Sequence, residues 1–320
     1  MTARLEQPET IAAETHICGR IIQSTGGLYR VEITASDEPH TVGATVDCRA
    51  KGAFRHEKLT PLAGDKVLVR RSEKGEGFIT EILPRKNSLI RPAVANVDTL
   101  VLVIASAHPD PDVYILDKLT AIAAFNGIDT VLAVNKCDLR SADELQKIYT
   151  SAGIPTFCLS ANDPESSLAV LEELRRTVRG KTAFFSGASG VGKSSLLNAL
   201  YPSLLQLETG EISRKIARGK HTTRVTTLFR VEENTYIGDT PGFSMVDVAG
   251  FNLLTLDGLL ESFPDIAAYA HDCRYTDCTH LCEDGCKVVE AVKAGKIAPS
   301  RHESFVRLYK ELKAVDPWKK

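Results

Sequence analysis

A glycine-rich segment contains the residue types that bind phosphate groups. Residues 187–194, Gly-Ala-Ser-Gly-Val-Gly-Lys-Ser, match the pattern G-x-x-x-x-G-K-S/T. The glycines allow successive backbone N–H groups to face an anion, and the N-terminus of the following helix adds a positive field. In such a loop Lys193 reaches the β- and γ-phosphates, and the Ser194 hydroxyl ligates magnesium. An apolar run, Thr182–Phe185, precedes the loop and a helical pattern, Ser195–Leu200, follows it, as the motif requires.

A second motif indicates which base is bound. Asn135–Asp138 reads N-K-C-D and ends the apolar run Thr130–Val134. The Asp138 carboxylate can accept hydrogen bonds from N1–H and from the exocyclic amine of guanine. Adenine has no N1 proton, and unmade hydrogen bonds of this kind discriminate by about 10⁴-fold. Lys136 can lie along the base plane and Asn135 can tie this loop to the phosphate loop, so we expect GTP or GDP rather than ATP.

Two shorter motifs complete the expected nucleotide site. Ser160-Ala161 ends the strand-like run Thr156–Leu159 and would offer a backbone N–H to the guanine oxygen. In the segment D-T-P-G, Asp239 would hold magnesium through water, and the Gly242 N–H would meet the γ-phosphate. The expected nucleotide contacts are Asn135, Lys136, Cys137, Asp138, Ser160, Ala161, Gly187, Ala188, Ser189, Gly190, Val191, Gly192, Lys193, Ser194, Ser195, Thr223, Asp239 and Gly242, with magnesium ligated by Ser194 and Thr223.

The segment between the phosphate loop and Asp239 bears on hydrolysis. Residues 210–224 are polar and basic, which favours a switch that only the γ-phosphate orders, with a plain exposed loop as the alternative. Phe243 follows Gly242, where many GTPases place a glutamine that positions water, and an apolar side chain cannot do so. His221 is our candidate catalytic residue, against the alternative of an exposed loop histidine. We expect slow intrinsic hydrolysis that a partner accelerates.

Four of the eight cysteines are scattered and four are clustered. Cys18, Cys48, Cys137 and Cys158 are scattered, and we interpret the last three as buried or inert thiols. Three thiolates and one imidazole within fourteen residues predict a closed tetrahedral site for one structural zinc ion, with the ligands Cys273, Cys278, His280 and Cys286. Cys282 and His271 are spare candidates for that site. Disulfides are the weaker interpretation, because the expected compartment is reducing.

The nucleotide motifs need a parallel sheet to bring them together. Apolar runs such as Thr99–Ile104 and Thr130–Val134 are typical of strands buried on both faces. Helical patterns alternate with them, one over Asp112–Phe125 and one opened by Ser141 with Glu144 completing a capping box. The alternation predicts a doubly wound α/β domain over residues 98–250.

The order of the motifs along the chain is unusual. In ordinary GTPases the phosphate loop precedes N-K-x-D, whereas here Asn135–Asp138 and Ser160-Ala161 precede Gly187–Ser194. The sequence therefore predicts a circularly permuted P-loop GTPase core. The same sheet forms with its chain ends moved, so the switch after Asp239 leads directly into the C-terminal part of the chain.

The regions on either side of the predicted GTPase core differ from it in their sequence patterns. We expect residues 1–15 to form a disordered tail and residues 85–97 a linker. About five short strand patterns separated by glycine turns over residues 16–84 predict an all-β barrel of the oligonucleotide-binding (OB) type, with an SH3-like barrel as the alternative. Residues 251–320 are expected to form a mainly helical zinc-binding domain. Its helices are predicted over Lys287–Lys293 and over Ser300–Leu312, the second with Ser300 and Glu303 as capping box.

Composition sets the broad class. The 320 residues are 43% hydrophobic and 25% charged with a net charge of −2, as in an ordinary soluble protein. The longest apolar run, near Leu100–Ala105, is far short of the roughly 20 residues that span a membrane. No secretory signal pattern is visible, so we expect a cytoplasmic monomer that does not bind membranes.

With its motifs in this order, the chain resembles the ribosome small subunit-dependent GTPase A family (RsgA, YjeQ-type). The resemblance covers nearly the whole chain, from Cys48–Gly52 (C-R-A-K-G) and Pro61–Asp65 (P-L-A-G-D) through the cysteine cluster, whose four expected ligands match the family motif. It implies an OB-fold N-terminal domain, a permuted GTPase core and a zinc domain. It also implies a GTP hydrolase that binds the small ribosomal subunit and its rRNA late in maturation, with hydrolysis stimulated by that subunit.

Two other functions remain open on the sequence alone. Phe243 favours a nucleotide-sensing RNA-binding module with little intrinsic catalysis. The barrel and the zinc domain could also bind nucleic acid without any coupling to the nucleotide. GTP turnover in the presence of the partner distinguishes the nucleotide-sensing module from a hydrolase. Affinity for the ribosomal subunit that is the same with GTP and GDP would identify the uncoupled nucleic-acid-binding protein.

Overall fold

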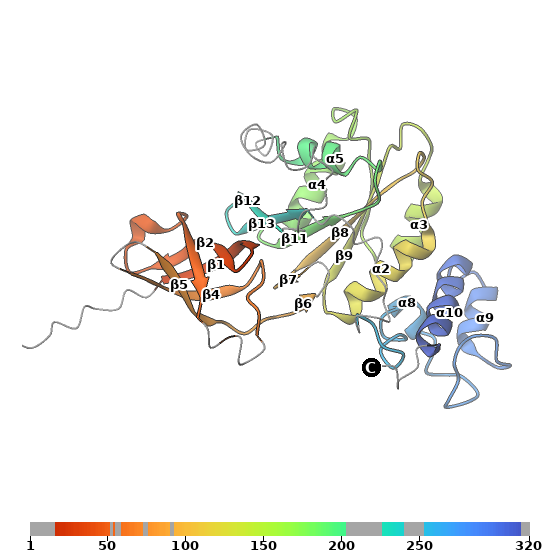
Figure 1. The fold of residues 1–320 in the computed structure, drawn as a ribbon. Helices are drawn as coiled ribbons and strands as arrows, with labels where there is room; N and C mark the ends of the chain where they lie inside the picture. The colour runs from red at the N-terminus through yellow and green to blue at the C-terminus, as the bar shows by residue number, and fades with distance from the viewer. Residues whose placement is uncertain are drawn as a thin grey trace, which may run out of the picture. The chain divides into compact units, whose positions relative to one another are not determined.

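The computed structural model describes residues 17–51, 54, 59–72, 76–89, 93–202, 226–239 and 253–314. The chain divides into two compact units, Met1–Arg85 and Lys86–Lys320 (Figure 1). The expected tail at residues 1–15 lies outside the described residues.

The first unit is a closed barrel of five strands in the order β1-β2-β3-β5-β4. Its core is apolar, as the alternating sequence pattern requires, with Ile21, Val31, Ile33, Val67 and Ile79 fully buried. The parallel pair β3–β5 closes the barrel, in agreement with the predicted OB type. The strands are β1 (Ile17–Thr25), β2 (Leu28–Ser36), β3 (Thr45–Ala50), β4 (Lys66–Arg71) and β5 (Gly77–Ile82).

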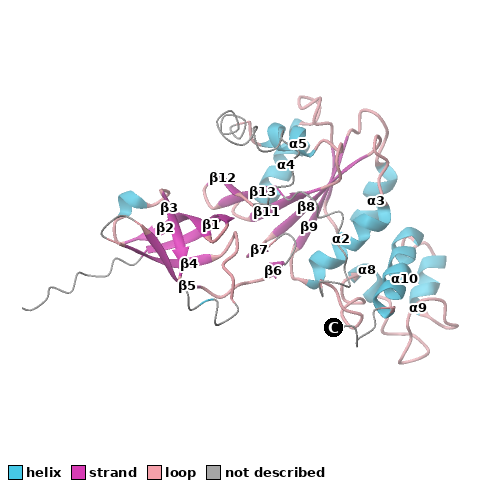
Figure 2. Cartoon of the chain, in the orientation of Figure 1, coloured by secondary structure: helices cyan, strands magenta, loops and turns pink. Residues whose placement is uncertain are grey.

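The second unit is built on a six-stranded sheet in the order β10-β9-β8-β11-β13-β12 (Figure 2). Five strands are parallel, as predicted, and β12 is an antiparallel edge strand that the sequence analysis did not include. The strands are β8 (Thr99–Ala105), β9 (Asp129–Asn135), β10 (Thr156–Cys158), β11 (Thr182–Ser186), β12 (Leu228–Glu232) and β13 (Thr235–Asp239).

Helices cover both faces of this sheet (Figure 1). The apolar sides of α4 (Leu168–Val178) and α5 (Lys193–Leu200) pack on one face, together with strand residues such as Val103 and Phe185. The helices α2 (Val113–Phe125) and α3 (Asp143–Ser151) lie on the other face. The arrangement is the doubly wound α/β fold that the alternating pattern predicted.

The sequence predicted where helices lie better than it predicted the residues at which they begin. Asp112 caps α2, since its carboxylate accepts from Ile115 N at 3.0 Å. The capping box of Ser141 and Glu144 was wrong, because α3 begins at Asp143 with Ala142 as its cap and no side-chain cap. Ser141 Oγ only accepts from Asp143 N, at 3.2 Å.

The C-terminal part of the second unit is mainly helical. It contains α8 (Pro264–Ala267), α9 (Lys287–Lys293) and α10 (Pro299–Lys313). The capping box predicted at Ser300 and Glu303 was also wrong: proline at the first position starts α10 one residue earlier. The Ser300 hydroxyl is buried and has no hydrogen-bond partner in the described structure.

Residues 85–97, expected as a linker, contain a small hairpin. Its strands are β6 (Ser88–Leu89) and β7 (Val94–Ala95). The Asn87 side chain pairs with the backbone of Val97 through two hydrogen bonds of 2.9 Å, and Asn96 Oδ1 accepts from Lys86 N. The segment is therefore tied to the start of the second unit.

A buried ion network joins α2 and α3 to the C-terminal helices. Arg301, on α10, is 1% exposed and forms a forked pair with Asp265, with one contact of 2.8 Å. Its other terminal nitrogen donates to Asp117 on α2, also at 2.8 Å. Tyr149 on α3 donates to the same Asp117 oxygen. Such a network is strongly destabilised by the loss of one member, because a buried charge is left unpaired.

Among the described residues, no helix has the length and apolar character needed to cross a bilayer.

Candidate functional site

The nucleotide motifs meet at one edge of the sheet. Because β8, β9, β10, β11 and β13 are parallel, their carboxyl ends lie together, and each motif follows one of these ends. Asn135 ends β9, Ser160 follows β10, Gly187 follows β11, and Asp239 ends β13 in register with Phe185. We call this region the nucleotide edge.

Two glycines of the phosphate loop are required by close packing as well as by backbone conformation. A Cβ on Gly187 would lie 2.2 Å from the Val103 carbonyl oxygen of β8. Gly192 has φ +88°, and a Cβ there would lie 2.2 Å from Asn135 Nδ2. The loop thus packs directly on the neighbouring strand ends, and only glycine fits at both positions.

The Asn135 side chain connects three loops. Its amide nitrogen donates to Val191 O in the phosphate loop at 2.9 Å, and its amide oxygen accepts from Ala161 N at 2.8 Å. The side chain is 3% exposed, so these hydrogen bonds are shielded from water. The predicted tie between the guanine motif and the phosphate loop is present.

Lys136 is fixed at both ends. Its backbone is left-handed (φ +63°) and its carbonyl accepts from Ser106 Oγ at 2.6 Å. Its ammonium group donates to Gly190 O at 2.7 Å and to His108 O. Lys136 therefore holds the phosphate loop at Gly190, next to the Asn135 contact at Val191.

The loop after β8 also belongs to the nucleotide edge, and sequence reasoning missed it. Arg140, two residues after the guanine motif, donates to Ser106 O at 2.6 Å and pairs with Asp110 at the same distance. The available signal was position: polar residues 106–112 follow a buried parallel strand.

The Ser160-Ala161 loop differs in detail from the expectation. Ser160 N donates to Ser167 Oγ at 2.9 Å, and Ala161 N donates to Asn135. Both N–H groups already have acceptors, so a guanine oxygen would have to share or replace one. The Ser160 hydroxyl, in contrast, is buried with no hydrogen-bond partner among the described residues.

The remaining nucleotide candidates are partly described. Asp138 is exposed at the nucleotide edge, and Ser194 and Ser195 are exposed in the first turn of α5. Asp239 is described only as the end of β13, without its side chain. The other predicted residues, His221, Thr223 and Gly242, lie outside the described residues.

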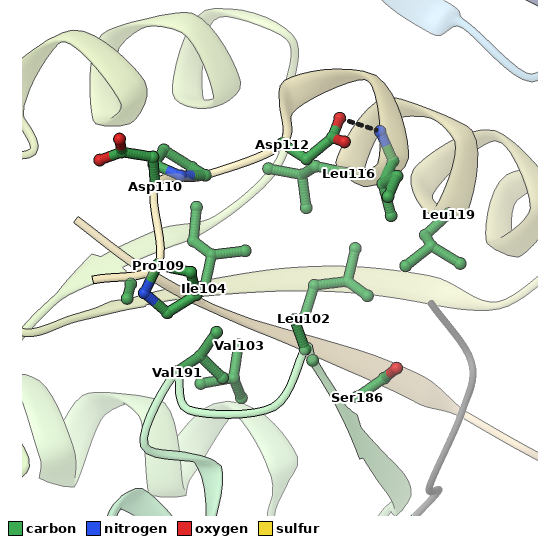
Figure 3. A pocket seen from close by; sticks show the side chains of 15 residues that line it. Leu102, Val103, Ile104, Pro109, Asp110, Asp112, Leu116, Leu119, Ser186 and Val191 are labelled. Atoms are coloured by element: carbon green, nitrogen blue, oxygen red, sulfur yellow. Dashed lines mark hydrogen bonds between the residues drawn. The ribbon is translucent and has the colours of Figure 1, made fainter. Parts of the chain in front are cut away.

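An apolar cavity of about 120 Å³ lies beside the phosphate loop (Figure 3). Its walls come from β8, the start of α2 and the loop itself, including Leu102, Leu116 and Val191. Its lining is mostly apolar, and it shares Gly187, Ala188 and Val191 with the expected phosphate contacts.

The four predicted metal ligands form a second cluster. The sulfur atoms of Cys273, Cys278 and Cys286 and a ring nitrogen of His280 all lie within 4.8 Å of one another. We call these residues the cysteine cluster. Burial raises the pKa of the Cys278 thiol to about 12. A cation is needed to hold such thiols as thiolates near neutral pH, and three thiolates with one imidazole are a donor set that suits zinc.

Hydrogen bonds shape the loop around the cysteine cluster. The Glu283 carboxylate accepts from the backbone N–H groups of Thr279, Leu281 and Cys282 at 2.9–3.0 Å. Burial acts to raise the pKa of Glu283, but these hydrogen bonds and that of the Thr279 hydroxyl lower it to about 2. The two spare candidates, Cys282 and His271, are exposed and stand outside the cluster.

Family models cover most of the chain. The model described as RsgA GTPase matches residues 82–249, more than half of the sequence, and the model described as RsgA N-terminal domain matches residues 18–79. The chain belongs to the RsgA GTPase family. The resemblance seen in the sequence is thereby confirmed, and the chain is a GTPase.

Individual RsgA relatives match over almost their whole length. The small ribosomal subunit biogenesis GTPase RsgA of Alkaliphilus metalliredigens is 40% identical over 92% of this chain and 97% of its own. The crystal structure of YjeQ from Thermotoga maritima superposes with a TM-score of 0.75, at 32% identity over 94% of this chain and all of that one. YloQ, described as a circularly permuted GTPase, gives 0.74 at 30% identity, over 94% of this chain and 96% of that one.

The permuted RsgA order is visible in the sheet. The strand before the phosphate loop, β11, lies between β8 and β13, although β8, β9 and β10 all precede it in the chain. The predicted circular permutation is therefore confirmed.

Proposed function

We propose that this GTPase acts in late maturation of the small ribosomal subunit, binding the subunit and its rRNA and hydrolysing GTP in response to that binding. The relative from Alkaliphilus metalliredigens reported above is named a small ribosomal subunit biogenesis GTPase. We further propose that it works as a cytoplasmic monomer without membrane contact.

One observation carries the nucleotide part of the proposal. The Asn135 amide bonds both to Val191 in the phosphate loop and to Ala161 in the base loop. A buried side chain with this pair of contacts preorganises the phosphate loop and the base loop, which would bind the phosphates and the base of one guanine nucleotide.

The chemistry then follows from the residues of the nucleotide edge. Gly187, Ala188, Ser189, Gly190 and Val191 would offer backbone N–H groups to the phosphates, Lys193 would neutralise the β- and γ-phosphates, and Asp138 would accept from guanine. Ser194 and Thr223 would hold magnesium, which supplies charge neutralisation on the transferred phosphate. The exposed Ser194 hydroxyl at the first turn of α5 fits that role.

Water activation is assigned to His221, because Phe243 cannot orient water. An imidazole can accept a proton from water and donate to the γ-phosphate. The test is turnover at saturating GTP: His221→Ala should keep GTP affinity and lose turnover, and unchanged turnover would exclude His221.

We assign one structural zinc ion to the cysteine cluster. Its four donor atoms are already within 4.8 Å of one another, and three cysteines with one histidine are typical of closed zinc sites. The ion would fix a segment that contains no helix or strand, so its role is stability rather than catalysis.

The parts of the chain receive separate roles. We propose that residues 16–84 bind rRNA, with exposed Arg49 and Lys51 on and after β3 facing its phosphates. Residues 98–250 hydrolyse GTP, residues 85–97 connect the two, and residues 251–320 carry zinc.

The decisive experiment is GTP turnover by the purified protein alone and with isolated small ribosomal subunits, with ATP as control. We expect strong stimulation by subunits and no turnover of ATP. Tight GTP binding without stimulation would leave the GTPase fold intact and favour a nucleotide-sensing RNA-binding module, which Phe243 supports. If the protein binds subunits with equal affinity in its GTP-bound and GDP-bound states, subunit binding is not coupled to GTP hydrolysis.

A further inference from the structure

Two cysteines from different strands lie together at the nucleotide edge. Cys137 N donates to Leu159 O at 3.1 Å, which places Cys137 beside the end of β10. Cys137 Sγ contacts Val134 O at 3.2 Å, and Val134 is the cross-strand partner of Cys158. The side chains of Cys137 and Cys158 are close enough to affect each other's pKa. Cys158 ends β10 and Cys137 lies beside that end, two residues after the end of β9, an arrangement in which a disulfide can form.

The two thiols differ in acidity, since the pKa of Cys137 is lowered, whereas the interaction with Cys137 and burial raise the pKa of Cys158. Both side chains are half-buried rather than enclosed. The hydrogen bond from Cys158 lowers the pKa of Cys137, against the opposing effects of burial and of the carboxylates Asp138 and Asp143. A lowered pKa increases the thiolate fraction, and the thiolate is the reactive form.

We propose that Cys137 and Cys158 are a modification site at which a peroxide forms a disulfide that weakens guanine-nucleotide binding. This inference rests on the proposed binding of guanine by Asp138.

The reaction balances in two steps. The Cys137 thiolate attacks one oxygen of hydrogen peroxide, and with one proton the products are the Cys137 sulfenic acid and water. The Cys158 sulfur then attacks the sulfenic sulfur, the S–S bond forms, the S–O bond breaks, and a second water leaves with the Cys158 proton. The two sulfur atoms are oxidised together by two electrons, and the peroxide is reduced.

The expected effect on binding follows from the position of Cys137. It stands between Lys136, whose backbone is in the left-handed region, and Asp138, which accepts from the base. A disulfide brings the Cys137 sulfur to covalent-bond distance from the Cys158 sulfur on β10. Residues 136 and 138, which flank Cys137, must then shift relative to the phosphate loop. Small displacements of positioned groups are costly in such sites.

The other cysteines provide an internal comparison. Cys48 is buried in the barrel, and burial raises its pKa to about 12, so it should resist oxidation. Cys282 is exposed, and it reports whether peroxide has reached the protein at all.

The experiment treats the metal-loaded full chain with hydrogen peroxide and maps disulfides by mass spectrometry of peptides. GTP affinity is measured before treatment, after treatment and after dithiothreitol. We expect a Cys137–Cys158 linked peptide, at least a tenfold loss of GTP affinity, and recovery on reduction. The control, Cys158→Ala, should bind GTP like the wild type and keep that affinity after peroxide.

Three outcomes would overturn the inference: no linked peptide when Cys282 is oxidised, a linked peptide with unchanged affinity, or equal loss of affinity in Cys158→Ala. The last would assign the effect to oxidation of Cys137 alone or of the cysteine cluster. Failure of the proposed function is seen separately, as absence of GTP binding by the reduced protein before any peroxide is added.

Discussion

The nucleotide edge and the cysteine cluster collect their residues in opposite ways. The nucleotide edge takes them from the ends of five parallel strands, across more than a hundred residues, and the backbone ladder of the sheet fixes each strand end. The cysteine cluster takes four ligands from residues 273–286, a described segment that contains no helix or strand. The first site is organised by the fold, whereas we propose that the second depends on a bound ion to hold its segment in place.

Metal removal is the strongest test of that difference. Because structural zinc sites contribute about 10 kcal/mol or more, chelation should abolish hydrogen-exchange protection around Cys273–Cys286 while β8, β9 and β11 stay protected. Hydrogen exchange read by mass spectrometry measures both regions in one sample. The exposed Cys282 gives the control, since Cys282→Ser should keep both the metal and the protection. Unchanged protection after chelation would contradict the assigned role of the ion.

Base recognition can be removed without disturbing the sheet. Asp138→Asn replaces an exposed carboxylate, so the unfolding free energy should stay constant. GTP affinity should fall by roughly 10³-fold or more, because the charge-assisted pair to N1–H and the amine is lost. Titration with GTP and with XTP measures this, and XTP should gain relative to GTP because an amide can donate to the extra xanthine carbonyl. Equal losses for both nucleotides would indicate damage to the loop instead.

The buried network of Arg301 tests how the metal-bearing part is held to the GTPase core. Arg301→Met should lower the unfolding free energy by about 3–5 kcal/mol, since Asp117 and Asp265 are left without a cation. Burial raises the pKa of Asp117, so the loss should grow as the pH rises through that raised pKa and this carboxyl must ionise without its cation.

Urea unfolding measures the effect of Arg301→Met, and Arg176→Met is the matched control. Arg176 makes only an exposed pair with Glu172 on α4, so its loss should cost no more than about 0.5 kcal/mol. Similar losses in the two variants would show that the buried network does not stabilise the junction.

The smallest effect is expected at the edge of the sheet. Glu232 on β12 accepts from Arg175 and Arg179 of α4 at 2.5 and 3.0 Å. Burial acts to raise the pKa of Glu232, but the two arginines hold it below its ordinary value of 4.5. Its stabilisation is therefore present above about pH 4.5 and disappears as the pH falls through the lowered pKa.

Thermal unfolding of Glu232→Gln across this pH range tests the assignment. The variant should be less stable than the wild type by about 0.2–1 kcal/mol at pH 7 and equal to it at low pH. A difference that does not change with pH would mean that packing of the side chain, and not its charge, is responsible.

Sequence reasoning was most successful where a pattern has one physical meaning. Apolar runs predicted β8, β9 and β11, and the helical spacing over Asp112–Phe125 predicted α2. It failed at the capping boxes of Ser141 and Ser300, because a serine followed three residues later by a glutamate also occurs where the neighbouring residue, or a proline, starts the helix. It missed β12, whose pairing depends on β13 rather than on its own sequence.

The sequence by itself determined the motifs, their permuted order and the residues of the cysteine cluster, since each depends on residue types at short spacing. Only the tertiary structure showed that Asn135 also accepts from Ala161 N, that Arg140 and Ser106 support the same edge, and that Cys137 lies beside the end of β10. It also revealed the junction at Arg301, whose partner Asp117 is 184 positions away along the chain. Contacts of that separation leave no local pattern, because they depend on how helices and strand ends pack, which the whole chain decides together.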